Sequence, residues 1–382
     1  MLDNYNPTYP SMDDIINKAR KRVPRFAIEY LEGGCNEDIN LKKNSSDIQK
    51  IELQPHYLRP ESKVSLSTEL FDETYSAPFG IAPIGLQGLI WPGSAEILAK
   101  AAFNHNIPFI LSTVTTASIE KISEITEGKF WFQLYHPAEN KLRDDIIDRL
   151  QNCGCKVLVI LADVPVFGFR PRDIRNGLAL PPRITLPNIL QVMGRPIWGL
   201  STLKHGIPEF STMKKYMPKN LNIKQLGVYM NQTFSGKLTT EKISAIRKKW
   251  QGKLILKGVV NDEDAKLAKS LGIDGFIVSN HGGRQIDAGE SSINSFSKLA
   301  PTYKNHLPLM IDSGISSGVD IARCMASGVD FTFLGRSFMF SVGALGSDGG
   351  EHAIYMLKAQ LQQVLEQVGC QTPNQLPNFL MN

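Results

Sequence analysis

The stretch KLILKGVVNDEDAKLAKSLGIDGFIVSNHGG, residues 253–283, holds the unit from which the fold can be inferred. Two short apolar runs, KLILK and GFIVS, flank a segment of helical character, DEDAKLAKSLG. Successive residues of each run are apolar, which is typical of parallel strands that are covered on both faces. A strand, a helix and a second strand in this order predict a parallel β-α-β unit.

The same unit recurs along the chain. The other apolar runs are PFGIAP from Pro78, PFILS from Pro108, KFWFQLY from Lys129, KVLVILAD from Lys156, PLMIDSG from Pro308 and FTFLGR from Phe331. Eight β/α units in about 290 residues are the number and size typical of a TIM barrel, the (β/α)8 fold. A doubly wound sheet that binds a nicotinamide is not expected, because no GxGxxG motif follows any run.

The spacing of the runs predicts how the single domain, residues 1–382, is organised. Residues 1–75 contain helical segments such as MDDIINKARKRVPRFAIEYLEGG, which we expect to form a lead-in packed on a barrel of residues 76–370. The runs start roughly 20 to 35 residues apart, except that Lys156 and Lys253 are separated by 97 residues. We therefore expect a long insertion after the fourth strand, at about 174–240.

Composition limits the class of protein. Hydrophobic residues make up 42% and charged residues 21% of the chain, values close to those of globular domains. The five cysteines lack the spacing of a zinc site or a disulfide framework, and no apolar run reaches the roughly 18 residues that span a bilayer. The N-terminal segment carries acids where a signal peptide carries bases. We expect a cytoplasmic, reduced setting, no metal and no nucleic-acid partner.

Polar or glycine residues lie at the end of every predicted strand, where TIM barrels place their active sites. They are Gly85, Ser112, Gln133, Tyr135, Asp163, Lys257, Ser279, His281, Arg284, Asp312, Gly314, Gly335 and Arg336. Any one of them could merely end a strand. A barrel with a purely structural role would not need a polar residue after every strand, so the set predicts a site.

His281 is the candidate catalytic base, because neighbouring glycines would let a ligand approach and Asp163 could fix its tautomer. Arg284 and an arginine among Arg170, Arg172 and Arg175 suit a clamp for a carboxylate, and the choice of Arg170 rests partly on the resemblance described below. Lys257 could form a Schiff base, as in aldolase barrels, or place a cation beside an electron-rich cofactor. The glycine-rich ends of the last two strands, at 313–314 and 335–336, are where barrels often bind phosphate.

With the KG that ends LILKG, the segment SNHGGRQID resembles the signature of the FMN-dependent α-hydroxy-acid dehydrogenase/oxidase family, and the similarity runs from about Pro24 to Gly369. The resemblance implies FMN as cofactor and oxidation of an L-2-hydroxy acid to the 2-oxo acid. It implies that His281 takes the proton, that Asp163 pairs with it and that Tyr135 bonds the substrate hydroxyl. The implied substrate-carboxylate contacts are Tyr30, Arg170 and Arg284, and the implied flavin contacts are Pro83, Ile84, Gly85, Ser112, Gln133, Lys257, Ser279, Asp312, Ser313, Gly314, Gly335 and Arg336.

Two positions depart from the family pattern, and a third differs between the dehydrogenases and the oxidases of the family. Leu161 replaces a threonine that bonds the flavin, and Ser316 replaces an arginine near the phosphate, so FMN is expected to bind less tightly. Gly85 matches the lactate and mandelate dehydrogenases, whereas oxidases of the family commonly have alanine. We therefore expect electrons to pass to a quinone, with an oxidase that produces hydrogen peroxide as the alternative. L-Lactate is the favoured substrate because Val114 and Phe167, by family position, leave a small-to-medium pocket; a mandelate-type acid is the alternative.

The insertion has its own character. From Ile174 to Thr240 there are nine bases and one acid, and this excess of +8 is larger than the net charge of +5 of the whole chain. The apolar residues there include Ile189, Leu190, Met193, Trp198, Leu200 and Met213. In membrane-associated members of the family this loop contacts the bilayer, which implies peripheral attachment to the inner face of the cell membrane; a solvated, disordered lid is the alternative. The resemblance also implies a homotetramer. A Schiff-base aldolase and a non-catalytic scaffold barrel are the competing classes.

Overall fold

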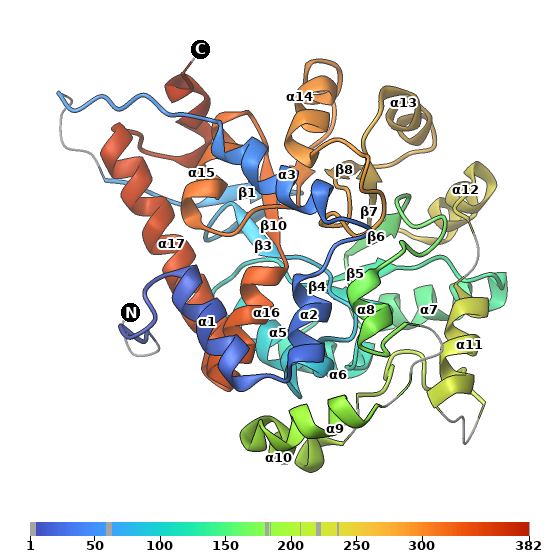
Figure 1. The fold of residues 1–382 in the computed structure, drawn as a ribbon. Helices are drawn as coiled ribbons and strands as arrows, with labels where there is room; N and C mark the ends of the chain where they lie inside the picture. Colours follow the sequence, from blue (N-terminus) through green and yellow to red (C-terminus); the bar gives the residue numbers. More distant parts are fainter. Residues whose placement is uncertain are drawn as a thin grey trace.

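The computed structural model describes residues 5–58, 63–179, 183, 185–206, 208–218, 223–234 and 237–381, without the side chains of residues 223, 224, 226, 227 and 231. Eight parallel strands form a barrel at its centre (Figure 1). The strand order is β3-β10-β9-β8-β7-β6-β5-β4, and a parallel bridge between Ile81 and Phe109 joins the first strand to the last. The predicted (β/α)8 barrel is confirmed.

Each predicted apolar run contains one barrel strand. The strands are β3 Phe79–Ile81, β4 Ile110–Ser112, β5 Trp131–Leu134, β6 Val157–Leu161, β7 Lys253–Val259, β8 Gly275–Val278, β9 Leu309–Ile311 and β10 Phe331–Leu334. Alternate residues point inward and outward: Val157 and Val159 belong to the cluster inside the barrel, while Leu158 and Ile160 belong to the larger cluster that includes the helices. Both faces are buried, which explains why the runs contain few polar residues.

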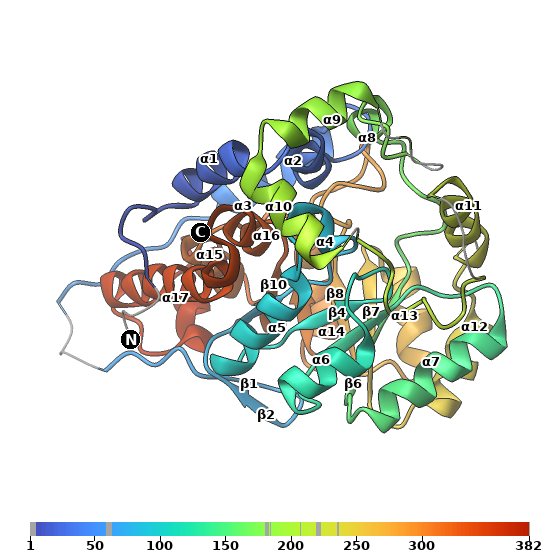
Figure 2. The same ribbon diagram turned by 90° about the horizontal axis from the view of Figure 1, so that it is seen from below.

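Helices surround the barrel (Figures 1 and 2). Those that follow barrel strands are α4 Gln87–Ile90, α5 Ser94–Asn104, α6 Ile119–Thr126, α7 Asn140–Asn152, α12 Thr240–Lys249, α13 Asp262–Ser270, α14 Ser292–Tyr303, α15 Gly318–Ala326, α16 Arg336–Leu345 and α17 Gly349–Val368, with 3-10 helices at Gly346–Asp348 and Pro373–Phe379. The N-terminal helices are α1 Met12–Arg22, α2 Arg25–Glu32 and α3 Ile39–Gln49.

A short antiparallel hairpin closes the end of the barrel opposite to the carboxyl ends of its strands. Its strands are β1 Thr68–Leu70 and β2 Glu73–Tyr75, which the sequence did not lead us to expect. Leu70 belongs to the apolar cluster inside the barrel, and the ring centroid of Phe71 lies 5.8 Å from that of Trp131, at the start of β5. Access to the barrel interior is therefore left at the opposite end, where the polar residues gather.

Between β6 and α12 the chain forms α8 Pro171–Arg175, α9 Leu186–Met193, α10 Pro196–His205 and α11 Ile223–Thr233. The described part of this insertion is anchored on the barrel. The indole of Trp198 donates to the carbonyl of Ile90 at 2.9 Å and packs edge-on against Phe26, while Thr212 donates to the carbonyl of Ala117 at 3.0 Å. Among the described residues, no helix is both long and apolar enough to cross a bilayer.

Two residues of the insertion do not have the role that we expected. Trp198 and Met213 are buried against the barrel, so they cannot belong to an apolar surface that contacts lipid. The sequence shows only that a side chain is apolar, and the contacts with Ile90 and Phe26 decide that Trp198 faces inward. Of the nine bases, Lys219 and the side chain of Lys224 lie outside the described residues.

Candidate active site

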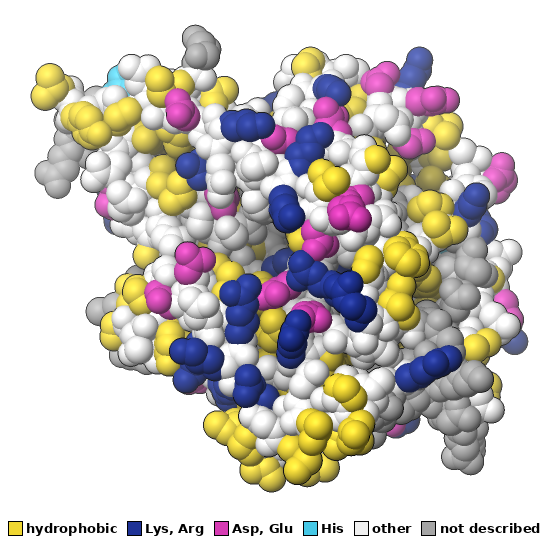
Figure 3. All heavy atoms as spheres, in the orientation of Figure 1, with side chains coloured by type: hydrophobic (Ala, Val, Ile, Leu, Met, Phe, Trp, Pro, Cys, Tyr) yellow, Lys and Arg dark blue, Asp and Glu magenta, His cyan; other side chains and the backbone are white. Residues whose placement is uncertain are grey.

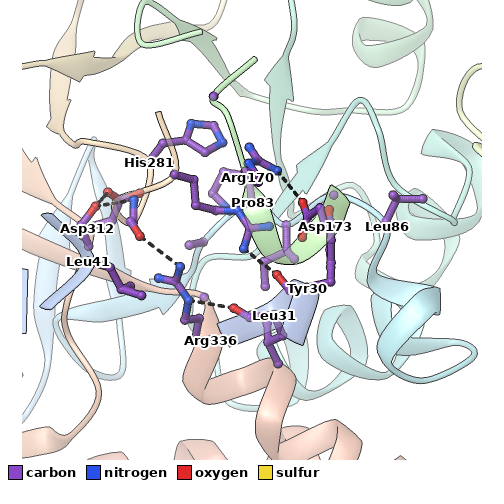
Figure 4. Close-up of a pocket in the computed structure, with 18 of the residues that line it drawn as sticks. Tyr30, Leu31, Leu41, Pro83, Leu86, Arg170, Asp173, His281, Asp312 and Arg336 are labelled. Atoms are coloured by element: carbon purple, nitrogen blue, oxygen red, sulfur yellow. Dashed lines mark hydrogen bonds and ion pairs between the residues drawn. The ribbon is translucent and has the colours of Figure 1, made fainter. Parts of the chain in front are cut away.

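A cavity of about 730 Å³ opens at the carboxyl ends of the barrel strands. The predicted site residues that line it are Tyr30, Pro83, Ile84, Gly85, Tyr135, Arg170, Lys257, His281, Arg284, Asp312, Ser313, Gly314, Gly335 and Arg336. Figure 4 shows His281 and Arg170 close to each other, with Arg336 below them beside Leu31. The structure therefore brings together residues from seven barrel strands and the N-terminal lead-in.

The other four predicted residues lie behind those that line the cavity. Asp163 contacts His281, and the hydroxyl of Ser279 accepts from the ammonium of Lys257 at 2.8 Å and from the backbone N–H of His281 at 3.0 Å. Ser112 donates to the side-chain oxygen of Gln133 at 3.0 Å, and both are buried. These four residues thus bond one another or the residues that reach the cavity.

The backbone at His281 is in the left-handed region, with φ 60°, which few residues other than glycine adopt. We expected the following glycines to let a ligand approach, and Gly282 does line the cavity; both glycines also allow close packing. A Cβ on Gly282 would lie 2.7 Å from a guanidinium nitrogen of Arg336, and one on Gly283 would lie 2.6 Å from the backbone of Leu41. The two glycines allow Arg336 and α3 to pack closely against the segment that carries His281.

His281 and Asp163 form the predicted pair. The imidazole Nδ1 lies 3.2 Å from both carboxylate oxygens, and Nε2 lies 3.4 Å from the hydroxyl of Tyr135. Burial lowers the pKa of His281, although Asp163 opposes the shift. Burial alone would raise the pKa of Asp163, but the positive charge of Lys257 and the hydrogen bond with His281 outweigh it and lower that pKa. At neutral pH the pair is therefore a neutral imidazole held by a carboxylate, which is the state that a general base needs.

Lys257 is buried, and its ammonium interacts with three neighbouring side chains. Its ammonium lies 3.2 Å from Asp312 and 3.7 Å from Asp163, in addition to its bond with Ser279. Burial opposes the charged form, but the two carboxylates outweigh it and raise the pKa of Lys257. A Schiff-base lysine needs the opposite, a lowered pKa that leaves a neutral amine. Lys257 is accordingly a fixed cation at the wall of the cavity.

Three arginines share the cavity. Burial, and then the charge of Arg170, lower the pKa of Arg284; burial and the charges of Arg284 and Arg170 lower the pKa of Arg336 to about 9. Nε of Arg170 and Nη2 of Arg284 are buried and have no hydrogen-bond partner among the described residues. A bound anion would accept hydrogen bonds from these unpaired donors and would reduce the repulsion between the guanidinium groups.

Two residues of the site were not predicted. Asp173 is buried, lines the cavity and lies 3.8 Å from Arg170; burial raises its pKa. Gln285 donates to the backbone carbonyl of Asp163 at 3.0 Å and accepts from Arg170 at 3.4 Å, so it links the two segments that carry the base and the clamp. Their positions offered a signal, because Asp173 lies three residues after Arg170 and Gln285 directly follows Arg284.

The far end of the cavity has the character expected for a phosphate. Gly335 is the N-cap residue of α16, and a Cβ built on it would have no heavy atom closer than 3.7 Å. Ser316 lines this end, and its hydroxyl donates to Asp320 at 2.9 Å. Leu161 lines a separate small cavity and is not among the residues that line the large one. The weaker FMN binding expected from Ser316 and Leu161 stays a prediction.

Fold and site together define an enzyme of the (β/α)8-barrel class, with its active site at the carboxyl ends of the strands. Residues 19–382 match the model of the family described as FMN-dependent dehydrogenase. An L-lactate dehydrogenase of Acinetobacter baylyi is 32% identical over 363 residues, which are 95% of this chain and 94% of the relative.

Solved structures agree with this assignment. (S)-Mandelate dehydrogenase, described as a monotopic membrane protein, superposes with a TM-score of 0.93 at 31% identity over 99% of this chain and 100% of that one. A mandelate oxidase gives a TM-score of 0.80 at 26% identity over 97% of each chain. The chain belongs to the FMN-dependent dehydrogenase family.

The residues present fit FMN. The cavity offers a buried cation in Lys257 on one side, and glycine-rich strand ends with Arg336 on the other. Arg336 donates to the backbone carbonyls of Leu31, Gly33 and Gly282, so it is held in place as a positive charge at the cavity wall. Three arginines in one cavity favour an anionic group such as a phosphate.

Proposed function

We propose that this enzyme oxidises a small L-2-hydroxy acid, most favourably L-lactate, to the corresponding 2-oxo acid. The observation that carries the proposal is the pair of unpartnered guanidinium donors, on Arg170 and Arg284, in a cavity that His281 also lines. A carboxylate would satisfy both donors and would place the adjacent carbon and hydroxyl of a 2-hydroxy acid near the imidazole.

In this proposal the residues have separate tasks. Arg170 and Arg284 bind the substrate carboxylate, and Tyr30 supports Arg284, whose guanidinium lies 4.9 Å from the centroid of its ring. His281 accepts the proton that leaves the substrate, and Asp163 stabilises the imidazolium that results. Burial, and then the charge of Asp163, raise the pKa of Tyr135, so its phenol keeps its proton and can donate to the substrate oxygen.

FMN would be held by Lys257 and the backbone of Pro83, Ile84 and Gly85 at one end, and by Gly314, Gly335 and Arg336 at the other. When bound, FMN supplies the acceptor for the two electrons that the substrate loses. Ser112, Gln133, Ser279, Asp312 and Ser313 would complete its contacts. Lys257 is positioned to stabilise negative charge beside it, since its own raised pKa keeps it protonated.

The substrate is tested by steady-state kinetics. We expect kcat/KM to be highest for L-lactate and to be lost for D-lactate. The second candidate is a mandelate-type acid, which the apolar residues Leu178, Phe210, Met230 and Phe234 favour, because they also line the cavity. A higher kcat/KM for (S)-mandelate than for L-lactate would establish that alternative, and no rate with either would overturn the proposal.

We further propose that the enzyme attaches peripherally to an anionic membrane surface and passes electrons to a quinone there. Large apolar side chains of α9 and α10 are exposed: Leu186, Ile189, Leu190, Met193, Ile197, Leu200 and Leu203. Figure 3 shows hydrophobic side chains gathered over these two helices at the lower edge, with Lys and Arg side chains nearby. An exposed apolar patch next to basic residues suits a monotopic contact with lipid. The homotetramer remains a prediction.

A further inference from the structure

A second, smaller cavity lies behind Tyr135. Its volume is about 130 Å³, and His136, Leu161 and Lys237 are among the residues that line it. Tyr135 and Phe234 line both this cavity and the large one, and their rings pack edge to face with centroids 6.0 Å apart. Two aromatic side chains therefore separate the small cavity from the active site, and the proposed reaction does not use it.

His136 is the unusual member of this small cavity. Its side chain belongs to a residue that is only 7% exposed, and neither ring nitrogen has a hydrogen-bond partner in the part of the chain that the structure describes. A buried imidazole loses its hydrogen bonds to water, so leaving both nitrogens unpaired is unfavourable. The cavity beside the ring is the place where a ligand would supply such a partner.

The charges around His136 indicate what that partner is. Burial, and then the positive charges of Lys242 and Arg143, lower the pKa of His136 to about 4. Arg143 is partly neutralised by Asp144, which lies 2.7 Å away, whereas the ammonium of Lys242 donates to the carbonyl of Lys237 at 2.7 Å. None of the described residues lining the cavity is acidic. Lys237 lines the cavity, and the bond to its carbonyl holds Lys242 beside it. Water would only pair with the imidazole, whereas an anion would also balance the positive charge of these lysines.

We propose that the cavity behind Tyr135 binds a small anion of carboxylate size, with His136 as its hydrogen-bond donor and Lys242 as its counter-charge. The volume equals about four water molecules at roughly 30 Å³ each, which suits a short carboxylic acid and excludes a nucleotide. Because Tyr135 and Phe234 form the shared wall, a bound anion would restrict their movement. It should therefore lower kcat without raising KM. The proposal holds for any of the candidate substrates.

The test uses the FMN-loaded enzyme with carbon-13 at Cε1 of its histidines, observed by NMR. The His136 signal is identified as the one lost in His136→Gln. Sodium acetate, sodium pyruvate and sodium chloride are added in separate titrations. At about pH 5, close to the pKa of about 4, we expect a saturable shift of the His136 signal towards the imidazolium position with acetate and pyruvate, because a nearby negative charge raises the pKa of the ring. Chloride should produce a smaller shift, because it lacks the second oxygen of a carboxylate, and an equal shift with chloride would overturn the assignment to a carboxylate.

Two variants make the result specific. Lys242→Met should weaken the apparent affinity of acetate for this site several-fold, whereas Lys248→Met, at an exposed position on the same helix, should leave it unchanged. Binding in the active site would instead shift His281 and compete with the substrate. The absence of a saturable His136 shift with all three salts would overturn the proposal and leave the cavity to water. An unchanged affinity in Lys242→Met would overturn the role of that lysine.

Discussion

At the scale of single residues, the site depends on charges that oppose one another within one cavity. Lys257 keeps its proton because Asp312 and Asp163 lie within 3.7 Å, and Asp163 stays ionised because Lys257 and His281 lie beside it. His281 is held neutral mainly by burial. A change of any one member therefore alters the protonation of the others, which gives each substitution a characteristic pH dependence.

The first prediction concerns the base. His281→Ala should keep FMN bound and lower kcat by about 10²-fold or more, the contribution typical of general base catalysis. In the native enzyme the lowered pKa of His281 keeps the imidazole neutral, so kcat/KM should fall with decreasing pH only below about 6.5. Asp163→Ala should give an intermediate kcat and shift this acid limb to lower pH, because Asp163 raises the pKa of His281. Near-normal turnover in His281→Ala would show that another group is the base.

The second prediction concerns the clamp. Arg284→Lys keeps the positive charge but loses the guanidinium fork and its bonds to the carbonyls of Tyr30 and Gly33, at 2.8 and 3.1 Å. We expect kcat/KM for the 2-hydroxy acid to fall severely while the flavin absorbance is retained. Equal kcat/KM in Arg284→Lys and the native enzyme would remove Arg284 from the carboxylate site.

The third prediction concerns the phosphate end. Ser316 lines the cavity there and its backbone N–H donates to Asp320 at 3.0 Å, a bond that a substitution of the side chain preserves. Ser316→Arg should lower the dissociation constant of FMN, because an arginine adds a charge-assisted hydrogen bond to phosphate. Fluorescence titration of the apoprotein with FMN measures it, with Ser316→Gln as the uncharged control. An equal constant for both variants would contradict the prediction.

At the scale of elements, the sequence predicts what is apolar but not always which way it faces. The eight strands were predictable because both of their faces are buried. The hairpin β1–β2 was not, because its strands have three residues each and include Glu69 and Glu73, so no apolar run marks them. In the insertion, Trp198 and Leu200 are both apolar, yet Trp198 is buried against Ile90 while Leu200 is exposed.

The same limit applies to the site. Most of the predicted residues that line the cavity follow from their places at strand ends, whereas Tyr30 and Arg170 follow from the family resemblance. The predicted contact between His281 and Asp163 is present. Asp173 and Gln285 were not predicted as site residues because neither ends a barrel strand. The left-handed backbone of His281 and the contact between Gly282 and Arg336 depend on packing across distant segments, which local sequence does not record.

The fourth prediction concerns α9 and α10. The excess of basic residues suggested attachment that salt releases, but Lys214 pairs with Glu209 and Lys215 with Asp145. Burying an exposed leucine contributes about 1.5 kcal/mol or more, and salt does not screen it, whereas each base contributes about 1 kcal/mol that salt does screen. We therefore expect high salt to weaken the binding to anionic vesicles without abolishing it.

A matched pair of variants tests the contribution of these helices. Replacing Leu190, Leu200 and Leu203 by Gln should abolish sedimentation with vesicles, since these residues are 58%, 67% and 81% exposed. Leu267→Gln, at a position 45% exposed on α13, should sediment as the native protein does. Undiminished binding of the triple variant would assign α9 and α10 to a contact with another protein or to solvent, and complete release of the native protein by salt would make charge the dominant contribution.

At the scale of the whole molecule, the barrel and its insertion together decide which electron acceptor reaches the site. Phe167, Phe169 and Ile174 line the cavity and are also exposed, and they belong to the same connection between β6 and α12 as the apolar helices α9 and α10. A lipid-soluble acceptor could therefore enter from the membrane side along apolar side chains. Gly85 also lines the cavity, and a Cβ on it would come within 2.8 Å of Val114.

The last prediction follows from this arrangement. We expect the reduced enzyme to be reoxidised slowly by O2 and rapidly by a short-chain ubiquinone or by an artificial dye, with both rates measured by stopped-flow absorbance of the flavin. A short-chain quinone is soluble, so its reaction with the reduced enzyme should not require vesicles. A long-chain quinone should react only when the enzyme and the quinone are bound to the same bilayer. The triple variant of α9 and α10 should keep the rate with the short-chain quinone and lose the rate with the long-chain quinone. This result would distinguish access through the membrane from the chemistry of the site. Stoichiometric hydrogen peroxide at a rate that matches dye reduction would make the enzyme an oxidase.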